Sequence, residues 1–209
     1  MKRFLTFFAL TVLSATVLSL TELSAQSAEH AKFMDIDMGV SIASFEKQLL
    51  QKGFEKHYLY SLYEGMGEYG QSQIPHDVKM FQGRFAGKDV EVIVFHTRSG
   101  LVHQVRVIYD SSEEWFEIHS AYQEMKQLFT KKYGKPYTCV EEFKGYSEGV
   151  ELSRLRDGEG QYFSAFDIPN GYAGVYIAVL NPDDSGTLVL EYFDRAAEQV
   201  LEDEKISDI

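Results

Sequence analysis

The chain has 209 residues, of which 44% are hydrophobic and only four are prolines, so it can bury a core and global disorder is excluded. Its 32 acidic and 20 basic side chains give a net charge of −12, which disfavours nucleic acid and anionic lipid as partners. The single cysteine excludes an internal disulfide and a cysteine-rich zinc or iron–sulfur site.

The first 27 residues have the order of a secretory signal peptide. A cationic start at residues 2–3 precedes an apolar run as far as Leu20, and Ala25 and Ser27 occupy the −3 and −1 positions of a signal-peptidase site. The alternative is an uncleaved membrane anchor, but the run is short for a ~20-residue span and contains several hydroxyl side chains. We therefore predict a periplasmic or secreted protein that begins near Ala28 and has no stable membrane insertion.

The first part of the mature chain predicts a strand, a helix and a meander. Residues 32–38 alternate and predict a short strand. Ser41 is placed to cap a helix that ends at Gly53, with Phe54 folding back onto it. The apolar face of this helix is formed by Ile42, Phe45 and Leu49. After a Tyr- and Gly-rich stretch to Asp77, three antiparallel strands are expected at 78–85, 90–96 and 101–109.

The second part repeats this order. A helix is expected to begin at Ser111 or Ser112, with capping-box spacing between Ser111 and Glu114, and to end before Gly134. Its apolar face is formed by Trp115, Ile118, Tyr122, Met125 and Phe129. Five strands are then predicted at 137–143, 150–155, 161–168, 173–180 and 187–193.

Together these elements predict an α+β fold made of two helix-then-antiparallel-meander repeats. The repeats are residues 28–111 and 112–194, preceded by a signal peptide at 1–27 and followed by an acidic C-terminal tail or frayed helix at 195–209. We expect one antiparallel sheet, or two joined edge to edge, with both helices packed on one face. The other face would be solvated or used for binding.

Two resemblances accompany this architecture. The segments Phe33-Met34-Asp35-Ile36-Asp37, Gly39-Val40-Ser41-Ile42 and Lys52-Gly53-Phe54 resemble the start of a group of small exported proteins of gut Gram-negative anaerobes, and Tyr192-Phe193-Asp194 fits their closing strand. The helix-plus-meander repeat is similar to the tandem fold of beta-lactamase inhibitor protein and its relatives. The resemblance implies a binding role and supplies no catalytic residues.

Two glycine motifs lack the context that their chemistry requires. Residues 145–149 match G-x-S-x-G, but 150–155 are predicted as a strand and no histidine follows His119, so a hairpin turn is favoured over a nucleophile elbow. Residues 65–70 match G-x-G-x-x-G, yet residues 71–75 are a poor helix start, which favours a loop over a dinucleotide site.

Metal and thiol chemistry are also not predicted. His96 and His103 flank a turn and could face each other, but spacing places no third ligand beside them. Asp157, Glu159 and residues 183–184 are read as turn residues rather than as calcium ligands. Cys139 is predicted to be a half-buried structural cysteine in an alternating strand with acidic neighbours.

One feature favours binding: tyrosines crowd into the first meander and its long loop. Tyrosine offers a large contact area with a polar tip, although aromatic side chains also fill cores. The candidate binding residues are Tyr58, Tyr60, Tyr63 and Tyr69. The predicted function is a non-enzymatic exported protein that engages a protein or glycan partner through an open sheet face or this Tyr-rich loop. The alternative is an envelope hydrolase with unidentified catalytic residues, and no catalytic residue, metal or cofactor is assigned.

Overall fold

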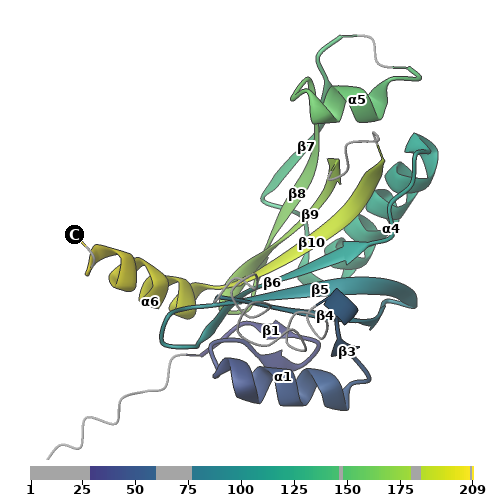
Figure 1. The fold of residues 1–209 in the computed structure, drawn as a ribbon. Helices are drawn as coiled ribbons and strands as arrows, with labels where there is room; N and C mark the ends of the chain where they lie inside the picture. The colour runs from purple at the N-terminus through teal and green to yellow at the C-terminus, as the bar shows by residue number, and fades with distance from the viewer. Residues whose placement is uncertain (1–28, 60–76, 146–147, 180–184, 208) are drawn as a thin grey trace, which may run out of the picture.

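The computed structural model describes residues 29–59, 77–145, 148–179, 185–207 and 209. Within them, eight strands form one antiparallel sheet in the order β3-β4-β5-β6-β10-β9-β8-β7 (Figure 1). The first four strands are β3 (Glu55–Lys56), β4 (Val78–Phe85), β5 (Lys88–His96) and β6 (Val102–Tyr109), and the other four are β7 (Thr138–Phe143), β8 (Gly160–Ile168), β9 (Gly171–Val179) and β10 (Gly186–Asp194).

Each half of the sheet follows its own helix in the chain. The helix α1 (Ile42–Gln51) precedes β3 to β6, and α4 (Trp115–Tyr133) precedes β7 to β10. The last strands of the two halves, β6 and β10, pair antiparallel at the centre, with Leu190 opposite Val107. The predicted α+β fold with helix-then-meander repeats is thereby confirmed, and of the two expected arrangements the strands of both halves form one continuous sheet.

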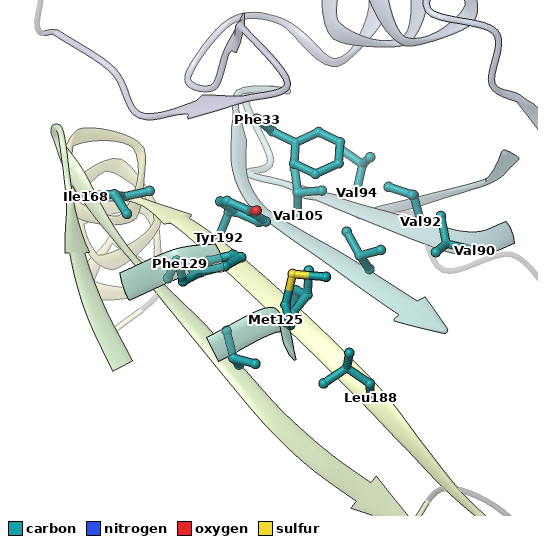
Figure 2. Packing of buried hydrophobic residues seen from close by; sticks show 14 of the residues in the cluster. Phe33, Val90, Val92, Val94, Val105, Met125, Phe129, Ile168, Leu188 and Tyr192 are labelled. Carbon is teal, nitrogen blue, oxygen red and sulfur yellow. The ribbon is translucent and has the colours of Figure 1, made fainter. Parts of the chain in front are cut away.

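Side chains alternate between two faces of the sheet, and one face holds the core (Figure 2). The covered face, as we call it, carries Val92, Val105 and Tyr192, which are buried. Tyr192 lies against Phe129 of α4, with ring centroids 5.9 Å apart, and against Phe33, with centroids 5.2 Å apart. Burial of these side chains removes apolar surface from water and fixes the helices α1 and α4 on this face.

The first helix has the predicted ends. The Ser41 side chain accepts a hydrogen bond from the Ser44 amide. At the other end, the Phe54 amide donates to the Leu49 carbonyl while Gly53, with φ of +89°, donates to the carbonyl of Leu50. These two bonds are those of a Schellman motif, in which glycine accepts the left-handed conformation without a Cβ penalty.

The single strand predicted at 32–38 is wrong, because the chain reverses within it. Two short strands, β1 (Lys32–Phe33) and β2 (Ile36–Asp37), pair with each other. Met34 and Asp35 both have positive φ, of 50° and 64°, which is the geometry of a tight hairpin turn. Phe33 and Ile36 are buried on the covered face, so the alternation reflects burial rather than one extended segment.

The strand predicted at 150–155 is also wrong: α5 (Glu151–Arg156) is a helix. Its Leu152 is buried and Leu155, three residues later, packs against the core. Glu151 in the first turn and Arg154 with Arg156 in the last turn complement the helix dipole. The helical spacing of Leu152 and Leu155, three residues apart, therefore decides the conformation, and the alternation from Val150 that predicted a strand does not.

The second long helix begins later than predicted. Ser112 bridges to Gly186, each amide donating to the other's carbonyl at 2.9 Å, and so extends the sheet instead of the helix. The helix starts at Trp115, and Glu114 supplies no side-chain cap. Ser112, rather than Ser111, accepts a bond from the Glu114 amide and donates to Glu117.

The acidic segment after β10 forms α6 (Arg195–Ile206), which extends from the end of the sheet (Figure 1). Its Ala197 is buried, and its Glu204 accepts bonds from the amides of Arg98 and Ser99 in the turn between β5 and β6. The helix is thus attached at both ends. No helix in the described part of the chain is long and apolar enough to cross a membrane.

Candidate functional site

The second face of the sheet, which we call the open face, is only half covered although it is rich in apolar side chains. Strand register places one set of alternating residues on it, from β4 across the centre to β8. Ala165 and Val189 on this face are buried, and the alternate residues form the core. We define the open-face set by residues of this face that are partly exposed. The set comprises Met80, Ile93, Phe95, Gln104, Arg106, Ile108, Phe163, Tyr176 and Glu191.

An ion pair lies at the middle of this face, where the two halves meet. Arg106 of β6 and Glu191 of β10 are opposite each other, with Nη2 and Oε1 2.6 Å apart and Nε and Oε1 2.7 Å apart. Gln104 donates to the same carboxylate oxygen at 3.1 Å, and the guanidinium lies 5.3 Å from the Phe95 ring centroid. These contacts fix a planar cation between an aromatic ring and a carboxylate.

Aromatic side chains continue the face towards the edge of the second half. The rings of Phe163 on β8 and Tyr176 on β9 are neighbours, with centroids 6.4 Å apart. They line a hollow of about 400 Å³ together with Gln161 and Glu191. Burial, helped by the charge of Glu191 and opposed by that of Arg106, raises the pKa of Tyr176 to about 12. The hydroxyl therefore stays neutral and can both donate and accept.

Of the predicted binding tyrosines, the structure places one. Tyr58 is 63% exposed, and its ring centroid lies 4.6 Å from that of His57. Tyr60, Tyr63 and Tyr69 lie outside the described residues, so their grouping stays a prediction. Phe81, which belongs to the same aromatic-rich region, is buried in the core.

The two glycine motifs gain no catalytic setting. A helix, α5, does follow Gly145 to Gly149, contrary to the prediction of a strand, but residues 146–147 lie outside the described part. No histidine follows His119 in the sequence, so a Ser–acid–His order is still missing. The G-x-G-x-x-G segment, 65–70, also lies outside the described residues.

The histidine pair shows no metal-binding arrangement. A bulge shifts the register between Phe95 and His96, and His96 Nδ1 donates to the Thr97 carbonyl at 2.9 Å. Burial, with the positive charges of His96 and Lys205, lowers the pKa of His103. Across the described residues, no group of three or more His, Cys, Asp or Glu side chains could hold a metal ion.

The acidic turn residues that could ligate calcium are engaged otherwise. Asp157 pairs with Arg156 at 3.1 Å and Glu159 with Arg154 at 2.7 Å. Residues 183–184 lie outside the described part of the chain.

Cys139 is exposed, and its predicted half-burial is wrong. It lies on β7, an edge strand, where the covering helix leaves the thiol accessible. Ser164 Oγ lies 3.4 Å from its sulfur and 2.7 Å from the Tyr122 hydroxyl. Beside it, contact with Lys126 lowers the pKa of the Glu141 carboxyl against the opposing effect of burial. This polar cluster ties α4 to the edge of the sheet.

An open sheet face was expected from the sequence, but its residues were not identified, because they are far apart in the chain. Arg106 and Glu191 are 85 residues apart, and only the pairing of β6 with β10 brings them together. The sequence does contain one indication of this face: consecutive residues of the central strands, such as Ile93 and Val94, are both apolar, so apolar side chains lie on both faces of the sheet. A comparison of the chain with protein-family models, curated proteins and solved structures gave no significant match.

Proposed function

We propose that this chain is a non-enzymatic, exported binding protein that engages a partner protein through the open face. The observation that carries the proposal is the row of half-exposed apolar and aromatic side chains across six adjacent strands. Contiguous apolar surface of this kind is uncommon on monomeric proteins and is typical of interaction surfaces.

The dimensions of this surface fit a protein partner. Six strands at the usual spacing span about 24 Å, and eight residues of strand extend about 27 Å, which gives roughly 600 Å². A standard protein–protein interface buries about 800 Å² on each partner. Loops around the sheet therefore need to add only a modest further area.

The chemistry of the face also favours a protein over a glycan. Its centre holds Phe95, Arg106 and Tyr176, residue types that dominate interface hot spots. Arg106 and Glu191 are engaged with each other, and Gln104 donates to the same carboxylate oxygen, so these polar groups are less available to sugar hydroxyls. The resemblance to beta-lactamase inhibitor protein remains a prediction, and the proposal does not depend on it.

Binding measurements on matched variants test this proposal. The folded protein is immobilised, a stoichiometric partner is captured from envelope extract, and its affinity for single variants is measured. We expect Phe163→Ala and Tyr176→Ala each to weaken binding by about 2 kcal/mol, the size of a hot-spot effect. The control is Phe116→Ala on α4, which removes an aromatic ring that is 77% exposed but lies away from the open face.

Three outcomes contradict the proposal. The first is unchanged affinity in both open-face variants, and the second is loss of affinity in Phe116→Ala. The third is capture of a polysaccharide instead of a protein, which would assign the face to glycans. Thermal melts of every variant separate loss of binding from loss of fold.

Export is tested separately. The mature N-terminus of protein recovered from the periplasm or medium should lie near Ala28. N-terminal sequencing that returned residues 2–3 on membrane-associated protein would contradict export.

A further inference from the structure

A cavity of about 380 Å³ lies on the covered face, between α4 and the turn that joins β4 to β5. Its floor is apolar: Met125 of α4 and Leu188 of β10, both labelled in Figure 2, together with Ile118. Leu128 forms part of the wall and is exposed. This volume is within the range of small-molecule sites, and the cavity is on the opposite side of the sheet from the open face.

The rim of this cavity is acidic. Four carboxylates, from Asp89, Asp110, Glu117 and Glu124, surround it, whereas Lys88 is the one basic side chain in its lining. Asp89 lies 3.5 Å from Arg84. Among the described residues neither Asp110 nor Glu124 has an ion-pair partner, so the rim has an uncompensated negative charge.

A polar group without a partner lies in the wall. The Tyr109 hydroxyl is shielded from water and forms no hydrogen bond within the described residues. Burial, with the nearby charge of Glu124, raises the pKa of Tyr109 far above its usual range, so the group is a neutral donor and acceptor. The hydroxyl oxygen has no accessible surface, so it lies behind the wall and a ligand in the cavity does not reach it.

From the apolar floor and the acidic rim of this cavity, we infer that it binds a small amphipathic organic cation. The apolar body of the ligand would lie on Met125 and Leu188, where the flexible methionine can adapt to its shape. Its ammonium group would lie by Glu124 and Asp110. The whole chain has a net negative charge, so long-range attraction also favours a positively charged ligand.

Three probes with one apolar body and different charge test this inference. They are 4-phenylbutylamine, 4-phenylbutanol and 4-phenylbutyrate, titrated into the folded protein and followed by amide chemical shifts and calorimetry. We expect the amine to bind at least fivefold more tightly than the alcohol, and the acid to bind most weakly. The shifted amides should belong to Ala86–Asp89, Asp110–Ser112 and α4.

Variants separate recognition from fold. Glu124→Gln should weaken binding of the amine by about threefold to fivefold, which is the size of an exposed ion pair. Binding of the alcohol should be unchanged. Glu142→Gln, an exposed acid on β7, is the control and should change neither probe. Tyr109→Phe should leave the binding of the amine unchanged and should not lower the unfolding midpoint, because it removes an inaccessible polar atom that nothing in the described structure satisfies.

The inference is overturned if the three probes bind equally, if the amine shifts amides elsewhere, or if the amine fails to bind at all. It is also overturned if Glu124→Gln and Glu142→Gln weaken the amine to the same extent, since that would be a general charge effect.

Discussion

At the scale of single residues, the buried carboxylate of Asp194 holds three parts of the chain together. Its Oδ2 accepts from the Ala31 amide at 2.6 Å, and its Oδ1 accepts from the Ala197 amide at 2.7 Å, which caps α6. His30 Nδ1 lies 3.0 Å from the same group. One side chain thus joins the first described residues, the end of β10 and the last helix.

Removal of this carboxylate should be costly. Asp194→Ala leaves two amides without their acceptor, and we expect the free energy of unfolding to fall by about 2–4 kcal/mol. Urea denaturation measures the change. Asp167→Ala is the control. Asp167 is exposed and forms only a long ion pair of 3.8 Å with Arg195, so this substitution should change the free energy of unfolding by less than about 0.5 kcal/mol. Equal losses in the two variants would contradict the bridging role.

His103 should make stability depend on pH. Burial lowers its folded pKa, and the positive charges of His96 and Lys205 add to this effect. The negative charges of Asp77 and Glu204 oppose it. The unfolded chain, with an ordinary histidine pKa of about 6.5, then takes up the proton first as the pH falls. The free energy of unfolding should therefore decrease as the pH falls below about 6.5 and be fully restored above it.

The measurement is urea unfolding at mildly acidic and mildly alkaline pH for the wild type and His103→Gln. The wild type should lose more stability on acidification than the variant. An identical loss in both proteins would show that other groups carry the effect.

At the scale of elements, the end of α1 depends on one left-handed residue. A Cβ added at Gly53 meets no atom within 4 Å, so the cost of a substitution is backbone strain alone. We expect Gly53→Ala to lower stability by about 1–2 kcal/mol and Gly53→Asn by roughly half as much, since asparagine tolerates this conformation. Chemical denaturation of the two variants decides, and an unchanged stability in Gly53→Ala would contradict the motif.

Local signals predicted the elements well where a pattern and its end agreed. Ser41 and Gly53 delimited α1, and turn residues delimited β4, β5 and β6, because capping and turn chemistry are encoded by neighbours in the chain. The failures were short segments. Residues 32–38 and 150–155 contain too few positions to distinguish a helix, a strand or a tight reversal, and contacts with distant residues decided their conformation.

At the scale of the whole molecule, the two halves share one sheet and should unfold together. Val92 of β5 is fully buried in the first half, whereas the only tryptophan, Trp115, lies in the second. Val92→Ala should lower stability by about 1–3 kcal/mol through loss of packing. Trp115 fluorescence and far-UV circular dichroism should show the same shifted transition, and a fluorescence transition that stays at the wild-type position would mean that the halves unfold independently.

The architecture and an open sheet face could be predicted from the sequence, but the residues that form this face and the acidic cavity could not. Repetition of a helix and a meander indicated a single sheet, and alternation indicated a core face. Which strands of the two halves meet was not encoded locally, and the central Arg106–Glu191 pair depends on that pairing. The acidic cavity likewise combines residues of the β4–β5 turn with residues of α4.

The central pairing of β6 with β10 also sets the order in which the chain can fold. Until residues 186–194 have left the ribosome, β6 has no neighbour on one side, and the first meander ends in an unpaired edge. The contact of Ala31 with Asp194, 163 residues apart, also requires the end of β10. Contacts of such long range form slowly, because the chain loses the entropy of loop closure before the contact contributes any stabilising free energy. A nascent chain with this topology keeps this edge open until β10 has been synthesised.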